Sequence, residues 1–367
     1  MVRVFVNARF LTQPKSGVQR YAYEILTALD TMLGSLDHDP LIAYYPANSE
    51  IIEWPGWKYI EIRALRGGSG HIWEQTALWR ASRNGALISL CNSGPVLHKN
   101  QIVALHDANI YAIPHAFSWK YRLFHKALRP ILARRADQLV TVSAFSAQEL
   151  ARYCSLSSKE FRIIPNSADH ILRIKPESGA LTEFGLSRGR YLLAVGNQSP
   201  NKNIARLAAA YAEVKDLPIL AIAGGEAHGL AAAGIENTDR IRVLGRVDDR
   251  SLRALYEGAK GFVWPSFYEG FGIPPLEAMA LGTPVLASRN SAMPEILGNA
   301  AVYFDPESLS DIRLAIELFC KADETEHNLM RSRGSDRAHL YSWENSAATL
   351  RDMVELSTTG RQTLVAE

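Results

Sequence analysis

Short apolar segments alternate with segments of helical periodicity almost from one end of this 367-residue chain to the other. Apolar runs of strand length occupy positions 2–6, 87–90, 102–105 and 139–142 in the first half, and 191–195, 219–223, 241–244, 262–264 and 284–287 in the second. After the first run, a loop ending at Gly17 leads into apolar positions three and four residues apart, a spacing typical of one helical face. This alternation predicts an α/β fold with parallel sheets covered by helices.

A break in this rhythm divides the chain into two similar halves. Positions 173–190 contain one proline, three glycines and several charges, a composition typical of interdomain linkers. A chain of 367 residues also exceeds the roughly 250 to 300 residues at which a single core stops growing. We therefore predict two Rossmann-like domains at 1–172 and 191–342, joined by a linker at 173–190. The remaining residues, 343–367, are expected to form a C-terminal helix that can pack back on the first domain.

Composition excludes several other classes of protein. Hydrophobic residues make up 47% of the chain and charged residues 21%, as in ordinary globular domains, and the net charge of +2 gives no general attraction to nucleic acid. The cysteines Cys91, Cys154 and Cys320 show neither a disulfide framework nor metal-binding spacing, which favours a reducing, cytoplasmic location. No apolar run approaches the ~20 residues of a membrane-spanning helix, so any membrane contact is expected to be peripheral.

The stretch 264–287, WPSFYEGFGIPPLEAMALGTPVLA, has the most specific chemical pattern. A strand ends at Pro265, a loop with two glycines follows, and Pro274 and Pro275 suit the first turn of a helix, where a missing N–H costs nothing. Free N–H groups and the positive end of the helix dipole favour a negatively charged ligand there, and glycines allow it to approach the backbone. The sequence therefore predicts an anion-binding site at this helix start.

Two carboxylates, Glu269 and Glu277, frame the loop. Ionised carboxylates accept hydrogen bonds from hydroxyl groups, so one of them can receive a sugar while the other receives a ribose. In the structural alternative, Glu269 is a surface loop charge and Glu277 stabilises the start of its own helix. The spacing alone leaves both interpretations open.

The same stretch resembles the E-x7-E signature of retaining GT-B glycosyltransferases of family 4 (group 1), with the pattern PS..EGFG.P.LEAMA.G.PV. Segments 16–24 (SGVQRYAYE), 136–150 (ADQLVTVSAFSAQEL) and 164–169 (IPNSAD) are similar to family segments in the same order. The resemblance implies the GT-B fold, in which two Rossmann-like domains face each other across a cleft. It also implies a nucleotide diphosphate sugar as the donor.

The resemblance assigns roles to individual residues around the signature. Glu269 is similar to the family's catalytic glutamate at the donor sugar, and Glu277 to the glutamate that holds the nucleotide ribose. Lys202, expected as catalytic, occupies the place of a lysine on the diphosphate, where one charge contact at 4 Å is worth roughly 4 kcal/mol before desolvation. The backbone amides that face the sugar and phosphates correspond to Gly270, Phe271 and Gly272.

Further donor contacts are expected at strand ends. Gly17 resembles the family's glycine at the donor phosphates, and His106 follows the 102–105 strand at a place where the family often has a histidine near the donor sugar. A packed structural histidine is the alternative for His106. Gly196 ends the first strand of the second domain, and Asn197 stands after it where many relatives have an arginine, so a second cation for the diphosphate is missing.

Three surface features leave alternatives open. Arg246 can lie near the nucleotide base or be an exposed turn residue. Asp37, His38 and Asp39 form a D-x-D, a metal motif of the other main glycosyltransferase fold, but no strand leads into it; no metal and no other cofactor are expected. The basic amphipathic segment 118–135 can contact anionic lipid or be the solvated face of a packed helix, which Pro130 is expected to interrupt.

These observations predict a retaining glycosyltransferase that moves a hexose from a nucleotide diphosphate sugar to a hydroxyl group of a glycan or lipid-linked saccharide, in polysaccharide or glycolipid biosynthesis. A UDP-hexose such as UDP-glucose is expected ahead of GDP-mannose. The alternatives are a GT-B nucleotide-sugar epimerase or hydrolase, and a non-catalytic scaffold that binds nucleotide sugars. Nucleic acid is not an expected partner.

Overall fold

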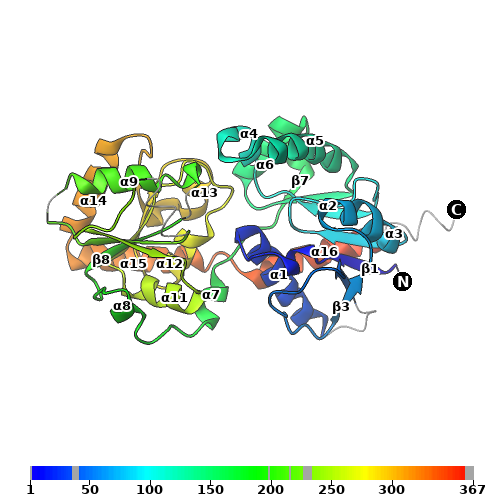
Figure 1. The fold of residues 1–367 in the computed structure, drawn as a ribbon, viewed down its shortest axis with the longest axis horizontal. Helices are drawn as coiled ribbons and strands as arrows, with labels where there is room; N and C mark the ends of the chain where they lie inside the picture. Colours follow the sequence, from blue (N-terminus) through cyan, green and yellow to red (C-terminus); the bar gives the residue numbers. More distant parts are fainter. Residues whose placement is uncertain (1, 35–40, 197–198, 215, 226–233, 360–367) are drawn as a thin grey trace. The chain divides into compact units, whose positions relative to one another are not determined.

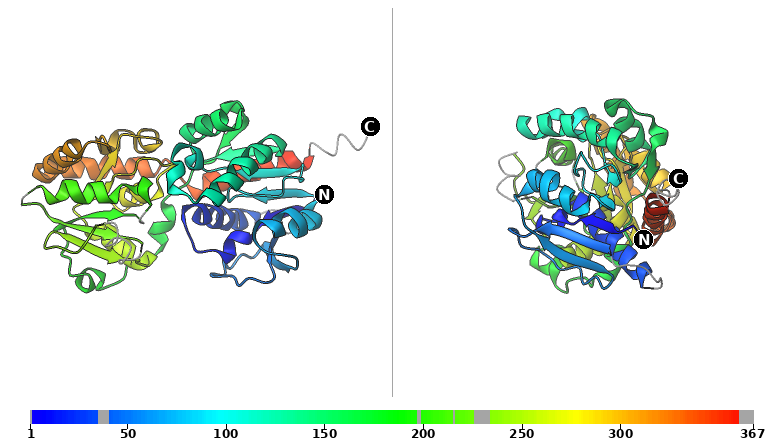
Figure 2. Two further views of the ribbon diagram at one scale, coloured as in Figure 1. Left: turned by 45° about the horizontal axis from the view of Figure 1, so that its top comes forward. Right: turned by 90° about the vertical axis from the view of Figure 1, so that its right-hand side faces the viewer.

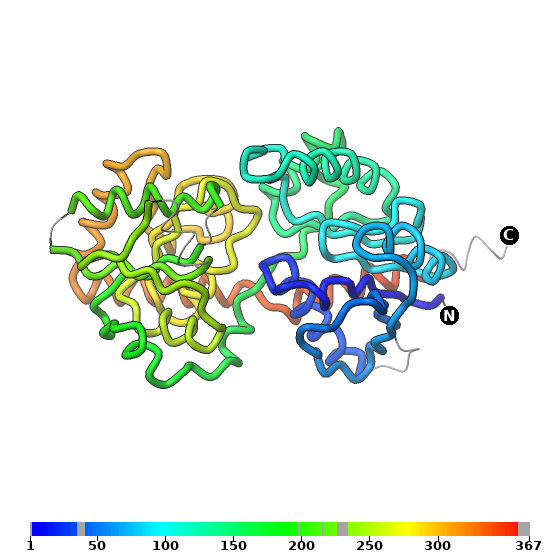
Figure 3. Tube along the Cα trace, viewed as in Figure 1, coloured from blue at the N-terminus to red at the C-terminus, as the bar shows by residue number. Residues whose placement is uncertain are grey.

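The computed structural model describes residues 2–34, 41–196, 199–214, 216–225 and 234–359. The chain forms two compact units, of which the first comprises Met1–Asn166 with Trp343–Glu367 and the second comprises Ser167–Ser342. The chain leaves the first unit after Asn166 and returns to it at Trp343 (Figure 3).

The first unit contains a parallel sheet whose described strands follow the order β3-β2-β1-β4-β5-β6-β7. Its strands are β1 (Val4–Asn7), β2 (Leu41–Pro46), β3 (Ile60–Leu65), β4 (Ala86–Ser89), β5 (Gln101–Ala104), β6 (Gln138–Thr141) and β7 (Phe161–Ile163). Its main helices are α1 (Gly17–Leu33), α2 (Gly70–Trp73), the π-helical turn η2 (Glu74–Leu78), α3 (Trp79–Ser82), α4 (Asn109–Ala112), α5 (Trp119–Arg135), α6 (Ala144–Cys154) and α16 (Trp343–Thr359).

The second unit contains a parallel sheet with the order β10-β9-β8-β11-β12-β13 among the described strands. Its strands are β8 (Tyr191–Val195), β9 (Ile219–Ala223), β10 (Ile241–Gly245), β11 (Gly261–Trp264), β12 (Val285–Ser288) and β13 (Ala301–Phe304). Its helices include α7 (Asp169–Arg173), α8 (Ala180–Glu183), the 3-10 turn η5 (Pro200–Lys202), α9 (Ile204–Ala212), α11 (Asp249–Gly258), α12 (Ile273–Ala280), α13 (Met293–Leu297), α14 (Leu309–Lys321) and α15 (Glu324–Ala338).

Helices cover both faces of the second sheet. Buried residues of α9 and α14, including Leu207 and Ile316, form one core with side chains from every strand of the sheet. Figure 1 shows α8 and α11 on the other side. Two Rossmann-like α/β units, as predicted from the alternating pattern, are thus confirmed.

In both sheets, the order in which successive strands are added changes direction at the first strand. Chain order runs outward from β1 through β2 and β3 on one side and resumes at β4 on the other, and β8 stands in the same position relative to β9 and β11. In open α/β sheets, ligands bind at the carboxyl ends of strands where the order reverses. The loops after β1 and β4, and those after β8 and β11, are therefore the places where a site is expected.

The second unit starts at Ser167, and positions 173–190 belong to it rather than forming a separate linker. Arg242 of β10 donates to the carbonyl of Phe184 at 3.0 Å, and the amide of Gly189 donates to the carbonyl of Gly258 at 2.8 Å. Leu186 between them is buried. The glycines and charges of this segment therefore mark turns that pack on the domain.

The C-terminal helix α16 lies alongside α1 within the first unit (red and blue in Figures 1 and 2). Trp343 is buried and meets the ring of Tyr21 edge-on, with 6.0 Å between centroids. Ser346 donates to the carbonyl of Pro165 at 2.8 Å.

Helix α5 runs through Pro130, so the expected interruption was wrong. Proline removes one backbone hydrogen bond, but Leu128, Leu132 and Ala133 bury the helix face on either side of it. This packing keeps the two halves of α5 in one helix. Among the described residues, none of the helices has both the length and the apolar character to span a bilayer.

Candidate active site

The loop between β11 and α12 is fixed by its glycine. Gly272 is the N-cap of α12 and has a φ of 93°, a left-handed conformation that L side chains rarely adopt. A Cβ at this position would also lie 2.5 Å from the Cε atom of Met293. Phe271, the residue before Gly272, is held in place because its buried ring meets the ring of Tyr341 edge-on, with 5.4 Å between the ring centroids. Glycine at position 272 therefore lets the loop enter the helix without backbone strain.

Lys202 and Glu269 lie together at the carboxyl edge of the second sheet, on the loops after β8 and β11. Lys202 Nζ donates to Glu269 Oε1 at 2.7 Å, and it lies 4.6 Å from the ring centroid of Trp264. Ser266 also donates to the same oxygen, and the backbone amide of Glu269 donates to Ser291 Oγ at 3.0 Å. The lysine side chain is 23% exposed and the glutamate 15%, so both can be reached by a ligand.

The two loops are tied to each other by hydrogen bonds to backbone carbonyls, two of them donated by the side chains of Ser266 and Asn203. The carbonyl of Asn201 accepts from the amide of Phe267 at 2.7 Å and from Ser266 Oγ at 2.8 Å. Asn203, in a left-handed conformation, donates to the carbonyl of Pro265 at 3.1 Å. The positions of Lys202 and Glu269 relative to each other are therefore fixed, because the chain around each residue is held in place.

Glu277 lies in the first turns of α12 and is buried, with 5% of its surface exposed. His170 Nε2 of α7 donates to its Oε1 atom at 2.9 Å, and Tyr256 Oη of α11 donates to its Oε2 atom at 3.0 Å. The sequence did not indicate either partner, because His170 lies 107 positions away and nothing in its spacing points to Glu277.

The ends of β8, β9 and β10 meet at the same edge. The amide of Gly196 donates to the carbonyl of Ala223 at 2.9 Å, and that of Gly224 donates to the carbonyl of Gly245 at 2.7 Å. Arg246 directly follows β10 and is exposed. Asn197 lies outside the described residues, so its expected contact with the donor stays a prediction.

In the first unit, Gly17 is the first residue of α1 and is exposed, after the N-cap Ser16. His106 follows β5 but has the features of a packed histidine. Its Nε2 atom lies 2.8 Å from the carbonyl of Leu90, which only accepts, so Nε2 carries the proton. Burial, assisted by the charge of Arg129, lowers the pKa of His106 to about 4. The imidazole is therefore neutral at pH 7, and its catalytic role stays a prediction.

A polar network at the reversal point of the first sheet was missed by the sequence analysis. The buried Glu74 accepts from Asn7 at 2.9 Å, from Arg9 at 2.9 Å, from Ser93 at 2.8 Å and from His71 at 2.8 Å. Burial raises the pKa of Glu74, but the hydrogen bond to His71 and the charge of Arg9 outweigh it and hold the pKa at about 2. This carboxylate is charged at neutral pH and fixes the loops after β1 and β4.

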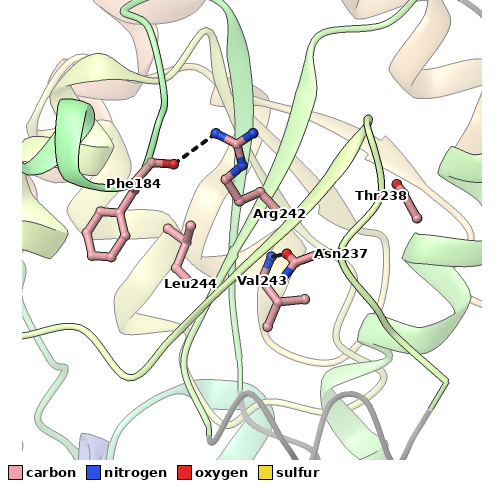
Figure 4. A pocket seen from close by; sticks show the side chains of 6 residues that line it. All are labelled: Phe184, Asn237, Thr238, Arg242, Val243 and Leu244. Atoms are coloured by element: carbon pink, nitrogen blue, oxygen red, sulfur yellow. Dashed lines mark hydrogen bonds between the residues drawn. The ribbon is translucent and has the colours of Figure 1, made fainter.

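Within the described ranges, no three His, Cys, Asp or Glu side chains are grouped so as to hold a metal ion. Asp37, His38 and Asp39 lie outside those ranges. A pocket of about 320 Å³ lies against β10, with Arg242 and Asn237 among its lining residues. Figure 4 shows these side chains from close by. None of the predicted site residues lines this pocket.

Residues 184–333 match the family model for glycosyl transferases group 1. The chain is 34% identical over 259 residues to O-antigen chain mannosyltransferase B of Escherichia coli, covering 66% of this chain and 67% of that protein. The chain belongs to the group 1 glycosyltransferases. O-antigen chain mannosyltransferase RfbU of Salmonella typhimurium is 26% identical over 341 residues, 86% of this chain and 90% of its own length.

Solved structures confirm the fold of this glycosyltransferase. Sucrose-phosphate synthase from Thermosynechococcus elongatus matches with a TM-score of 0.73 and 19% identity over 99% of both chains. Anabaena HepE, solved with UDP and glucose, matches with a TM-score of 0.75 and 15% identity over 97% of this chain and 100% of that one. The predicted GT-B fold and the predicted enzyme class are confirmed.

Proposed function

We propose that this glycosyltransferase moves a mannosyl group, with retention at the anomeric carbon, from GDP-mannose to a hydroxyl group of a growing polysaccharide. The observation that carries the proposal is the cluster of Lys202, Glu269 and Glu277 around the start of α12. Two relatives named O-antigen mannosyltransferases support mannose. This order places mannose ahead of the glucose that the sequence analysis favoured.

Each member of the cluster has a separate task. Glu277 accepts from ribose hydroxyls, and Glu269 accepts from hydroxyls of the donor sugar. Lys202 receives the diphosphate together with the backbone N–H groups of Gly272 and Ile273 at the start of α12. The bond between the anomeric carbon and the diphosphate oxygen breaks, and the acceptor oxygen forms the new bond on the same face. The acceptor proton leaves with the nucleotide diphosphate. Electrostatic stabilisation of the leaving group accelerates this step, and a protein lysine can supply it without a metal.

The ion pair between Lys202 and Glu269 has a consequence for donor binding. Lys202 Nζ and Glu269 Oε1 lie 2.7 Å apart, so the two charges neutralise each other. Donor phosphates offer the ammonium group a second partner, and the sugar hydroxyls offer the carboxylate hydrogen bonds in return. Exchange of partners at Lys202 thus couples the arrival of the diphosphate to the availability of Glu269 for the sugar.

A peripheral membrane contact through α5 is part of the proposal. One face of this helix is buried, whereas Trp119, Leu123 and Ile131 are 63%, 65% and 47% exposed. The exposed cations Lys120 and Lys126 lie among them. Exposed aromatic and aliphatic side chains next to lysines are typical of segments that bind anionic lipid surfaces. Such a contact would bring the enzyme to a lipid-linked acceptor.

The test is a transfer assay with GDP-mannose, UDP-glucose and UDP-galactose, each with and without an isolated lipid-linked oligosaccharide fraction. Acceptor-dependent release of GDP, with an α-linked mannose in the product, supports the proposal. Release of nucleotide without acceptor indicates the hydrolase, and a changed sugar on intact nucleotide indicates the epimerase. Tight binding with no product from any donor indicates the scaffold. Faster transfer from UDP-glucose would replace mannose by glucose.

A further inference from the structure

The carboxylate of Glu277 is held from behind by two buried donors on different helices. His170 Nε2 reaches Oε1 at 2.9 Å and Tyr256 Oη reaches Oε2 at 3.0 Å. His170 is 2% exposed and Tyr256 is fully buried. Each oxygen atom of the carboxylate therefore has its own protein donor.

We propose that His170 and Tyr256 are positioning residues that orient the Glu277 carboxylate for the ribose of the nucleotide. The inference rests on the proposed role of Glu277 as the ribose ligand. The terminal torsion of a glutamate is broad and roughly two-fold, so an isolated carboxylate samples many orientations. Two donors that grip different oxygens select one of them. A carboxylate accepts along about four directions, so this grip is compatible with ribose hydroxyls as further donors.

The two donors are themselves fixed. Arg253 of α11 donates to the carbonyls of Leu172 at 2.9 Å and of Ile171 at 3.2 Å, so it attaches α7, and with it His170, to the helix that carries Tyr256. Thr283, just before β12, donates to the backbone carbonyl of Tyr256 at 2.7 Å. Helices α7 and α11 therefore form one support for the carboxylate.

This support gives a reason for the position of His170. It lies directly after the segment 164–169, which resembles the family, at the point where the chain enters the second unit. A carboxylate oriented before the nucleotide arrives loses less conformational entropy on binding, and its preference for a ribose hydroxyl is sharper. The support should therefore act on discrimination between ribose and deoxyribose more than on affinity for the phosphates.

The experiment measures this discrimination directly. Calorimetry gives the dissociation constants of GDP and 2′-deoxy-GDP, and of UDP and 2′-deoxy-UDP, for the full-length protein and its variants. The wild type is expected to bind the ribose form at least about tenfold more tightly, or about 1.4 kcal/mol. His170→Ala and Tyr256→Phe should reduce the ratio at least about threefold. His170→Gln, whose amide nitrogen can take the place of Nε2, should restore most of it.

Matched variants separate positioning from general loosening of the domain. His327 is also buried in the second unit and donates to a backbone carbonyl, that of Phe319, at 3.0 Å. The Tyr211 hydroxyl likewise donates to the carbonyl of Pro218. His327→Ala and Tyr211→Phe should lower the melting temperature while keeping the ratio of the wild type. Equal loss of the ratio in these controls would overturn the inference.

The outcomes also distinguish the inference from the proposed function. If Glu277→Gln abolishes the ratio while His170→Ala and Tyr256→Phe keep it, the positioning role is wrong and the ribose role of Glu277 stands. If Glu277→Gln leaves the ratio unchanged, or the wild type binds neither nucleotide, the proposed donor site itself is wrong. Should His170→Ala fail to fold, Tyr256→Phe and His170→Gln carry the test.

Discussion

Replacement of His106 by glutamine should change how the stability of the first unit depends on pH. Burial lowers the pKa of His106 from 6.5 to about 4, so between these values the unfolded chain binds a proton that the folded chain does not. The stabilisation from the neutral, packed imidazole is therefore complete above pH 6.5 and is lost as the pH falls toward 4. Glutamine keeps an amide donor for the carbonyl of Leu90 but does not titrate.

The magnitude follows from the two pKa values. A tenfold change in proton affinity is worth about 1.4 kcal/mol, so the drop from 6.5 to about 4 is worth about 3 kcal/mol in total. Between pH 7 and pH 5, about 2 kcal/mol of this is lost. The pKa of His125 is also lowered to about 4, mainly by burial, and adds a loss of similar size. From these two groups the wild type should lose about 4 kcal/mol over this interval and His106→Gln about 2 kcal/mol.

Hydrogen exchange of peptides from α1 and β5, corrected for the intrinsic exchange rate, reports the free energy of opening of the first unit at each pH. The control is His115→Gln, because His115 is exposed to solvent in the folded protein. It should show the pH dependence of the wild type. If His106→Gln lost the same free energy between pH 7 and pH 5 as the wild type, His106 would not be the neutral, packed histidine that the structure shows.

Four further predictions concern function. Glu277→Ala should raise the dissociation constant of the nucleotide about tenfold or more, whereas Glu269→Ala should mainly lower turnover; equal losses that track the melting temperatures would contradict separate roles. Lys202→Ala should reduce single-turnover sugar transfer about 10- to 1000-fold, and unchanged kinetics would place the lysine outside the site. Transfer should persist in EDTA, and loss of activity restored by manganese would point to the D-x-D at 37–39. Leu123→Asp on the exposed face of α5 should weaken sedimentation with anionic vesicles without changing transfer to a soluble acceptor.

The strands that the sequence predicted best are those buried on both faces. The runs at 191–195 and 219–223 coincide with β8 and β9, whose residues are almost all buried in the centre of the second sheet. The edge strand β3 was missed for the opposite reason. In β3, exposed charged residues interrupt the apolar positions, as in Glu61 and Arg63, because one face of an edge strand meets solvent.

The candidate site also has a part that the sequence predicted and a part that it did not. Glu269, Gly272 and Glu277 lie in one continuous stretch, so a single motif indicated the loop, the helix start and both carboxylates. Their supports come from distant parts of the chain: His170 and Tyr256 for Glu277, and Lys202 for Glu269. The pairing of such residues depends on which loops the strand order brings to one edge, and the sequence pattern does not contain that order.

The structure also bears on the charge balance of the proposed diphosphate site, because no arginine follows Gly196 in the sequence. A donor diphosphate brings several negative charges, while Lys202 already forms an ion pair with Glu269. We therefore expect binding to draw on uncharged donors as well, among them the backbone N–H groups of Gly272 and Ile273 at the start of α12, where Pro274 and Pro275 supply none. Gly272 allows the backbone to present those groups, since its left-handed conformation turns the loop into the helix. With no arginine at position 197 of the sequence, we expect backbone donors beside this glycine to take over part of the task of a second cation.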